Sequence, residues 1–379
     1  MSNTASGFTK QYNRRSFLRG AGTGLAAGLL APSALDAQQA TTPEPITHAG
    51  VKRNLTDKEK VARIASNSYP IRWIFKNRGN VGDKKTVADM KKKYGEITLL
   101  DFPAFTKATF PGVTKMDIWS SLFGDVDDQS QYEPMTITGY DGKPRQITEF
   151  NPASDNGKKW LEKMAAKQHA EGVACHHISN NAPRDICDLD EGKRRAGIDV
   201  AKKWLDGAAI LGAKSMRVNS GGPRIAPSPQ PNETSYPKNP DLEKYMDKCI
   251  ESFKEMAEYG AQVGVKVTLE NHWGLTANPI NIRTIIEEVN NPYCEASPDF
   301  CNWEHKYLLY HALEDLAPYA HTTCHAKFWD RWGQPDVQRN VRIMLNNNYI
   351  GVFALEYEDC PWDGIEGAKY LYREVMAAL

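Results

Sequence analysis

Four short stretches of the sequence each combine an apolar run with a side chain that can bind a metal ion or transfer a proton. In chain order, these side chains are Glu270 in TLENHWG, Asp299 in SPDFCNW, His325 in CHAKF and Glu356 in ALEYE. The intervals between them are 29, 26 and 31 residues, close to the length of one strand followed by one helix. Because the pattern repeats at that interval, we expect the four side chains to follow successive parallel strands and to converge.

Three carboxylates that converge without a cation would repel one another and raise each other's pKa values. A divalent ion removes that repulsion, and three carboxylate oxygens with one imidazole nitrogen suit Mn²⁺, Mg²⁺, Co²⁺ or Zn²⁺. Taken singly, Glu270 is more typical of a salt-bridge partner and His325 of a hydrogen-bonded core residue. The joint spacing of the four residues favours a metal site.

The surrounding sequence alternates between strand-like and helix-like segments, as a sheet of parallel strands requires. Strands are expected at residues 61–70, 96–105, 172–179, 213–220, 265–271, 294–300, 320–328 and 349–358. Helices are expected at residues 86–95, 154–171, 192–212, 241–264, 280–290, 306–316, 335–348 and 364–379. This alternation predicts an α/β fold, a single-domain (β/α)8 TIM barrel at residues 61–379. Long βα-loop insertions at residues 103–152 and 221–240 are expected to overhang the barrel mouth.

The first residues of the chain differ from the rest and are typical of an export signal. Arg14 and Arg15 precede the apolar pair in NRRSFLRG, and a Gly- and Ala-rich run follows. We therefore expect residues 1–37 to be a twin-arginine signal that engages the twin-arginine export machinery and directs the chain to the periplasm or another exported location. The apolar run is too short for a stable membrane span. Residues 38–60 are expected to be a polar linker, and an uncleaved basic tail is the alternative to a signal.

The overall composition argues against a nucleic-acid-binding protein. The 379 residues include 47 lysines and arginines and 47 aspartates and glutamates, so there is no positive excess to attract phosphates. Hydrophobic residues make up 41% of the chain, which suffices for a large core. The seven cysteines are spread over a long chain without a CxxC pair, so a disulfide scaffold and a zinc staple are not expected.

Taken in order, TLENHWG, SPDFCNW, CHAKF and ALEYE resemble motifs of the sugar phosphate isomerase/epimerase superfamily of xylose-isomerase-like TIM barrels. The resemblance extends over residues 60–379. It implies a divalent metal ion, most often Mn²⁺, with the metal ligands Glu270, Asp299, His325 and Glu356. It also implies that the two glutamates are catalytic residues that flank the substrate and transfer protons. One departure is Asn302, which stands where many epimerases of this superfamily have a histidine.

Four further residues are expected to bind the substrate: His177, Arg217, His272 and Lys327. Arg217 ends the fourth strand, where the superfamily often has a polar or cationic substrate contact, and a buried ion pair is the alternative. His176 and His177 end the third strand, where alternation lets only one of them face the interior, and we favour His177. His272 follows the fifth strand. Lys327 lies two residues after His325 on the same face, with a solvated lysine as the alternative.

These features together predict a divalent-metal-dependent sugar isomerase or epimerase that removes a proton next to a carbonyl group. Because an exported enzyme meets few sugar phosphates, the expected partner is a small non-phosphorylated keto-sugar or glycoside. One alternative is a lyase or hydrolase that acts on 3-keto-glycosides by β-elimination, and another is a non-catalytic sugar-binding protein. An endonuclease-IV-like nuclease is disfavoured, since nine histidines and a net charge of zero suit neither a three-metal cluster nor DNA. The oligomeric state stays open, with a homo-oligomer among the alternatives.

Overall fold

The structure is a computed structural model that describes residues 54–78, 82–138, 143–222, 242–359 and 361–379. The expected twin-arginine signal at residues 1–37 lies outside the described residues, as do most of the expected linker and most of the loop at residues 221–240. The end of that linker forms the short helix α1 (Asp57–Val61). Within the described ranges, no helix combines the length and the apolarity that crossing a membrane requires.

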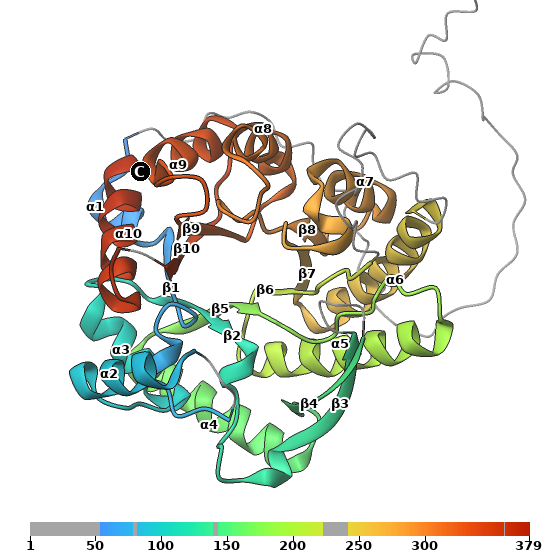
Figure 1. Cartoon of the computed structure of the whole chain (residues 1–379), viewed down its shortest axis with the longest axis horizontal. Coiled ribbons are helices and arrows are strands. Elements are labelled where there is room, and N and C mark those ends of the chain that lie inside the picture. The colour runs from blue at the N-terminus through green and yellow to red at the C-terminus, as the bar shows by residue number, and fades with distance from the viewer. Residues whose placement is uncertain (1–53, 79–81, 139–142, 223–241, 360) are drawn as a thin grey trace, which may run out of the picture. The chain divides into compact units, whose positions relative to one another are not determined.

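Eight parallel strands form a closed barrel, and their order round it follows the sequence (Figure 1). They are β1 (Ile64–Asn67), β2 (Lys115–Trp119), β5 (Ala174–Ser179), β6 (Ser215–Arg217), β7 (Lys266–Leu269), β8 (Cys294–Ala296), β9 (Thr323–Trp329) and β10 (Val352–Asp359). The barrel closes just beyond β8, where the amide of His325 donates to the carbonyl of Pro298 over 2.8 Å. Asp299 and His325 form a parallel bridge at the same place. The predicted (β/α)8 barrel is therefore confirmed.

The second strand lies elsewhere than the sequence pattern predicts. Residues 96–105 have the composition of a strand, yet they lead into helix α3 (Phe102–Thr109). Asp101 accepts hydrogen bonds from the backbone amide and the hydroxyl of Thr98 over 2.9 and 2.7 Å, and Pro103 lies in the first turn of α3. Both features favour the start of a helix. The second barrel strand is instead β2, within the segment that the sequence predicts to be a loop insertion.

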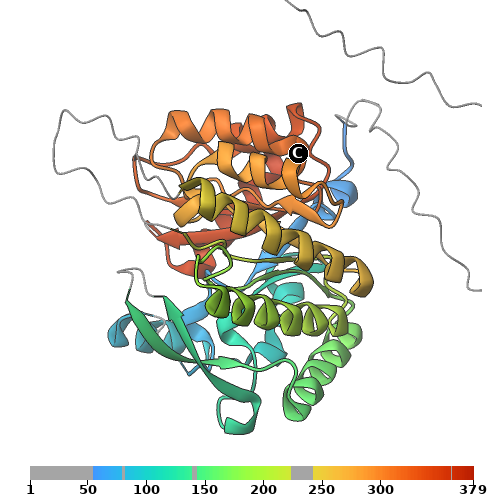
Figure 2. The same ribbon diagram turned by 90° about the vertical axis from the view of Figure 1, so that its right-hand side faces the viewer.

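The helices surround the barrel (Figures 1 and 2). Besides α3, they are α2 (Lys84–Tyr94), α4 (Asp155–Glu171), α5 (Glu191–Ile210), α6 (Leu242–Val263), α7 (Pro279–Val289), α8 (Lys306–Leu316), α9 (Val337–Asn346) and α10 (Gly364–Ala378). Helices α2 to α9 lie in the connections between successive strands, and α10 follows the last strand. Each helix turns apolar side chains inward, and Trp204, Phe253 and Leu371 are among those fully buried. Burying one such side chain contributes roughly 1.5–3 kcal/mol, so the helix layer holds the strands and the residues at their ends in place.

The connection between β2 and α4 contains an antiparallel hairpin of β3 (Tyr132–Thr138) and β4 (Pro144–Phe150), which lies beside α5 (Figure 2). Phe150 anchors the hairpin, because its ring contacts Phe123 and Trp204 with centroids 5.8 and 5.9 Å apart. Every βα connection leaves the C-terminal end of a strand. The hairpin therefore lies on the same face of the barrel as the strand ends that carry the candidate site.

Candidate metal centre

The C-terminal ends of neighbouring strands carry the four side chains that the sequence singles out. Glu270 directly follows β7, Asp299 lies just beyond β8, His325 lies in β9 and Glu356 in β10. All four are buried, with at most 7% of their surface exposed. The structure thus brings together residues that are up to 86 positions apart in the chain. We call these four residues the candidate metal centre.

The three carboxylates of the candidate metal centre converge on one nitrogen of His325. Its Nδ1 atom lies 3.1 Å from Glu270 Oε2, 3.5 Å from Glu356 Oε2 and 4.0 Å from Asp299 Oδ2. Donor atoms of Glu270, Asp299 and His325 all lie within 4.8 Å of one another. Because metal–oxygen and metal–nitrogen bonds are about 2.0–2.2 Å long, these donors are close enough to share one ion after small adjustments of their side chains.

Two donor atoms of the candidate metal centre are buried and have no hydrogen-bond partner among the described residues: Asp299 Oδ2 and His325 Nδ1. The amides of Cys301 and Asn302 donate to the other oxygen of Asp299, Oδ1, over 2.6 and 2.9 Å, and so direct Oδ2 toward the centre. Buried polar atoms without partners cost free energy. A cation at this point would satisfy both atoms, so the donor set fits a metal ion.

The charges of these residues are unbalanced in a way that a divalent ion would relieve. Burial, together with the nearby charges of Glu356 and Glu270, raises the pKa of Asp299 to about 7 despite the opposing charge of Lys327. Burial alone would lower the pKa of His325, but Glu270 and Glu356 hold it well above its usual range. Both shifts arise because negative groups crowd one another at low dielectric, which is the situation that a bound cation corrects.

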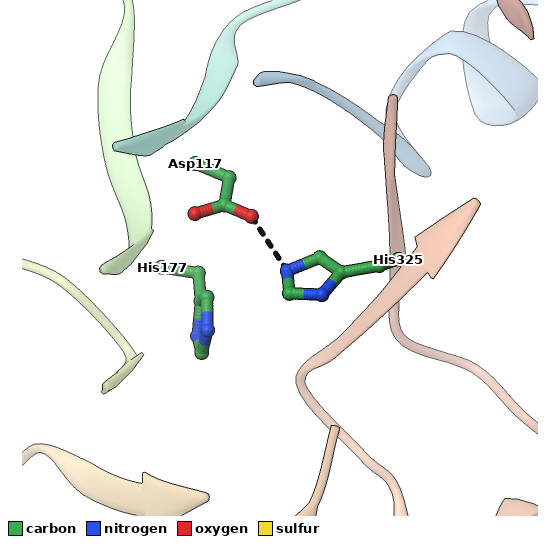
Figure 3. Close-up of side chains that lie close together, drawn as sticks. All are labelled: Asp117, His177 and His325. Carbon is green, nitrogen blue, oxygen red and sulfur yellow. Dashed lines mark hydrogen bonds and ion pairs between the residues drawn. The ribbon is translucent and has the colours of Figure 1, made fainter. Parts of the chain in front are cut away.

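The other nitrogen of His325 is held by a residue that the sequence analysis missed. Nε2 donates to Asp117 Oδ2 over 2.8 Å (Figure 3), and Ser179 and Asn67 donate to the same carboxylate over 2.8 and 3.0 Å. Burial opposes the charged form of Asp117, but its pKa is lowered because His177, His325 and Ser179 favour the carboxylate. Since a carboxylate only accepts, Nε2 carries a proton and Nδ1 is directed at the candidate metal centre. Asp117 is the aspartate within KMDIW, an otherwise mainly apolar stretch. It could have been predicted as a site residue only if that stretch had been recognised as the barrel strand β2.

Arg217 forms a buried ion pair with Glu270, the alternative to direct substrate binding that the sequence left open. Its Nη1 atom lies 2.7 Å from Glu270 Oε2, and its Nη2 atom donates to Asn181 Oδ1 over 3.2 Å. Asn302 donates to the second oxygen of Glu270 over 3.1 Å. Burial would raise the pKa of Glu270, but Arg217 and His325 hold it well below its usual range. Glu270 is therefore ionised and fixed in orientation.

Lys327 is buried, with 3% of its surface exposed, so it is not a solvated lysine. Its ammonium group lies 2.8 Å from Glu356 Oε1, 3.0 Å from Glu358 Oε2, 3.2 Å from Asn302 Oδ1 and 3.7 Å from Asp299 Oδ2. The expectation from the sequence that Glu358 faces the helices is wrong, because residues two apart on a strand share a face and Glu358 follows Glu356 by two. Lys327 thus supplies a fixed positive charge beside the Glu356 side of the candidate metal centre.

His177 lies next to the candidate metal centre, with its ring centroid 5.7 Å from that of His325. Its Nδ1 atom is 2.8 Å from Ser215 Oγ, whereas its buried Nε2 atom has no hydrogen-bond partner among the described residues. Burial lowers the pKa of His177 to about 3, so the ring is neutral. His176 instead places its Nε2 atom 3.3 Å from the carbonyl of Thr322, which precedes β9 at the opposite end of the barrel.

His272 is half-buried and lies two residues after Glu270. Its Nδ1 atom also lacks a hydrogen-bond partner within the described residues, and burial lowers its pKa to about 3. A neutral imidazole with one uncommitted nitrogen can exchange a hydrogen bond with a sugar hydroxyl. Of the four residues expected to bind substrate, His177 and His272 therefore keep that capacity, while Arg217 and Lys327 are engaged with carboxylates.

Comparison with known proteins agrees with this fold. Residues 138–378 match the family described as xylose isomerase-like TIM barrel. No curated protein sequence matches the chain.

Several solved structures share the fold. L-ribulose 3-epimerase aligns with a TM-score of 0.55 and 13% identity over 84% of this chain and 95% of that chain. The 3-keto-D-glucoside 4-epimerase of E. coli aligns with a TM-score of 0.52 and 14% identity over 82% and 98%. A xylose isomerase-like TIM barrel protein from Mycobacterium smegmatis, in complex with magnesium, aligns with a TM-score of 0.51 and 17% identity over 84% and 98%. At these identities the alignments establish the fold.

Proposed function

Because the chain belongs to the xylose isomerase-like TIM barrel family, we propose that it is a divalent-metal-dependent enzyme that isomerises or epimerises a sugar. The observation that carries this proposal is the convergence of three carboxylates on His325 Nδ1, with that nitrogen and Asp299 Oδ2 buried and without hydrogen-bond partners among the described residues. The epimerases among the structural neighbours support the same class of reaction. The expected export of the chain favours a non-phosphorylated keto-sugar or keto-glycoside as substrate.

The metal would be held by Glu270, Asp299, His325 and Glu356. Mn²⁺ is our first choice, with Mg²⁺, Co²⁺ or Zn²⁺ as alternatives, and any of them would polarise a substrate carbonyl and acidify the adjacent C–H bond. Asp117 keeps His325 Nδ1 directed at the ion by holding Nε2. Arg217 does the same for Glu270, since it pairs with that carboxylate over 2.7 Å.

We assign the proton transfers to the two glutamates. Glu270 and Glu356 extend from β7 and β10, with two strands between them, so they approach a bound sugar from different directions. One carboxylate can remove the proton from the carbon next to the carbonyl, and the other can return a proton from the opposite face, which inverts that carbon. His177 and His272 are placed to hydrogen-bond sugar hydroxyls through their uncommitted nitrogens.

A lyase that cleaves 3-keto-glycosides by β-elimination is the second candidate, and one observation favours it. Lys327 places a buried positive charge 2.8 Å from Glu356, where it would stabilise negative charge on a departing oxygen. Asn302, in contact with Lys327 and Glu270, stands where many related epimerases have a histidine. Both reactions begin with the same proton removal, so only the products distinguish them.

The test is hydrogen exchange in heavy water. The Mn²⁺-loaded protein is incubated with a panel of keto-sugars and 3-keto-glycosides, and mass spectrometry follows deuterium incorporation and product formation. We expect exchange with at least one compound, and a loss of at least about 100-fold in Glu356→Gln, because general-base catalysis commonly contributes that much. Glu162→Gln, which changes an exposed glutamate on α4, is the matched control. Metal-loaded protein that binds these sugars without any exchange would instead be a sugar-binding protein.

A further inference from the structure

A cavity of about 350 Å³ opens between the β3–β4 hairpin and the first turns of α5, outside the candidate metal centre. This volume is in the range of small-molecule sites, roughly 300–1,000 Å³. The walls are mainly apolar and include Met135, Ile137, Pro144, Pro183, Ala196 and Val200. These residues belong to two βα connections and the start of a helix, so the cavity lies on the face of the barrel where the strands end.

Charged groups line part of this cavity. Arg184 and Lys193 contribute two positive charges to the lining, and Asp185 contributes one negative charge. Lys193, which is exposed, also lies 3.7 Å from the half-buried Asp188, so that carboxylate offsets part of the positive charge of Lys193. An apolar cavity with two cationic side chains in its lining suits an aromatic group that carries phenolic or acidic substituents, since its ring buries apolar area while its oxygens can accept hydrogen bonds from Arg184 and Lys193.

A short series of contacts connects the cavity with the candidate metal centre. Arg184 Nε donates to the carbonyl of Asn181 over 3.0 Å, and the side chain of Asn181 accepts from Arg217 over 3.2 Å. Arg217 in turn pairs with Glu270 over 2.7 Å. The guanidinium group of Arg184 also lies 5.9 Å from the ring centroid of Trp273, three residues after Glu270. Two residues thus separate the lining of the cavity from a metal ligand.

We propose that this cavity binds the aromatic aglycone of a glycoside whose sugar ring lies at the candidate metal centre. The inference rests on the proposed function and narrows its substrate class to aryl glycosides with phenolic or acidic substituents. A sugar at the strand ends and an aromatic group against α5 would occupy two adjoining regions on the same face of the barrel. The aglycone would bind through apolar burial, and Arg184 and Lys193 would favour the substituted rings.

The first test measures binding of an aromatic anion, 8-anilinonaphthalene-1-sulfonate, by fluorescence titration. Ala196 is exposed and lines the cavity, so Ala196→Trp fills the cavity without disturbing the core. We expect the probe to bind the wild type and the conservative control Ala196→Ser equally, and Ala196→Trp at least about tenfold more weakly, because the indole occupies the apolar space in which the rings of the probe would be buried. Unchanged binding in Ala196→Trp, with circular dichroism like that of the wild type, would overturn the cavity as a ligand site.

The second test links the cavity to the reaction by comparing 4-nitrophenyl and methyl 3-keto-β-D-glucosides. Ala196→Trp should raise the KM of the nitrophenyl compound at least about tenfold and leave the kinetics of the methyl compound unchanged. Equal effects on both compounds would overturn the aglycone assignment. If the wild type turns over neither compound nor any other keto-sugar, the proposed function fails, while the probe titration still decides separately whether the cavity binds aromatic anions.

Discussion

At the scale of single residues, the candidate metal centre is defined as much by its supporting groups as by its donors. Asp117 holds His325, Arg217 holds Glu270, and two backbone amides hold Asp299. The contacts to His325 and Asp299 leave one donor atom of each directed at the centre, whereas Arg217 contacts Glu270 Oε2, the same oxygen that faces His325. Groups of this kind fix the orientation and the protonation state of metal ligands. Replacing one of them is therefore expected to weaken metal binding although all four ligands are still present.

The first prediction concerns Asp117→Asn, which preserves size but removes the negative charge that holds His325 Nε2–H. We expect the affinity for Mn²⁺ to fall by about 10- to 100-fold, the usual effect of losing such a partner. Equilibrium dialysis with elemental analysis measures this. Asp89→Asn, an exposed aspartate on α2, should bind Mn²⁺ like the wild type. Undiminished affinity in Asp117→Asn would mean that Asp117 has no role in orienting His325.

The second prediction concerns pH. Without metal, the pKa of His325 is raised well above its usual range and that of Asp299 is raised to about 7, so near neutral pH His325 holds a proton and Asp299 is partly protonated. Metal binding requires both groups in their deprotonated forms and must therefore release protons. Mn²⁺ affinity should rise as pH increases from about 6 to 8. Calorimetry in buffers of different ionisation enthalpy measures the released protons, and a pH-independent affinity would contradict this account.

At the scale of elements, the packing of α10 against β10 positions two acidic residues of the site. Glu356 and Glu358 share one face of β10, and the ring of Tyr357 lies on the other face against α10. Gly367 of α10 makes room for that ring, because a Cβ atom at this position would lie 2.2 Å from Tyr357 Cγ. The close approach of helix and strand therefore depends on a missing side chain.

The third prediction is that Gly367→Ala destabilises the protein by about 1–3 kcal/mol, the usual cost of overpacking a buried contact. Thermal unfolding measures the effect. Gly192→Ala is the control, since a Cβ atom there meets only the tip of the Asp190 side chain, at 3.2 Å. Alanine normally favours a helix over glycine, so the control should be neutral or slightly stabilising. Equal stability of Gly367→Ala and the wild type would show that α10 shifts freely along β10.

At the scale of the whole molecule, the candidate metal centre lies at the seam where the barrel closes. Asp299 and His325 come from the two sides of that seam and form the bridge between them. An ion bound by all four residues would connect four parts of the barrel: the end of β7, the segment that follows β8, strand β9 and strand β10. Because binding to the folded state alone stabilises a protein by mass action, the ion should strengthen this closure.

The fourth prediction is that Mn²⁺ raises the Tm of the protein treated with a chelator. When the concentration of free Mn²⁺ is 100 times its Kd for the folded protein, the free energy of unfolding is expected to rise by about 2.7 kcal/mol. Differential scanning calorimetry with and without metal measures it. Asp299→Asn replaces one ligand and should abolish most of the gain. A Tm that does not respond to any divalent ion would contradict the metal centre.

The fifth prediction concerns the N-terminal segment. We propose that residues 1–37 direct export through the twin-arginine machinery, so replacement of both Arg14 and Arg15 by lysine should retain the chain in the cytoplasm. Cell fractionation of a bacterium with and without that machinery measures this. Replacement of Lys10 by arginine, outside the pair, should leave export unchanged. Equal export of the double variant and the wild type would contradict the proposal.

The sequence by itself determined the fold and the convergence of the four donors. Strands of a parallel barrel alternate with helices at a regular interval, so side chains that recur at that interval meet at one end of the barrel. The alternation of strands and helices can be recognised along the chain even when one strand is assigned to the wrong residues. It was strong enough to predict the barrel although the second strand was placed at residues 96–105 instead of β2.

Only the tertiary structure decided which groups surround those donors. Asp117 and His325 are 208 residues apart, and their contact depends on the position of β2 opposite β9 across the barrel interior. The engagement of Arg217 with Glu270, the four oxygens around Lys327 and the cavity beside α5 likewise arise from contacts between distant segments. Such contacts carry no periodic signature along the chain, because they are set by side-chain packing and charge compensation in three dimensions.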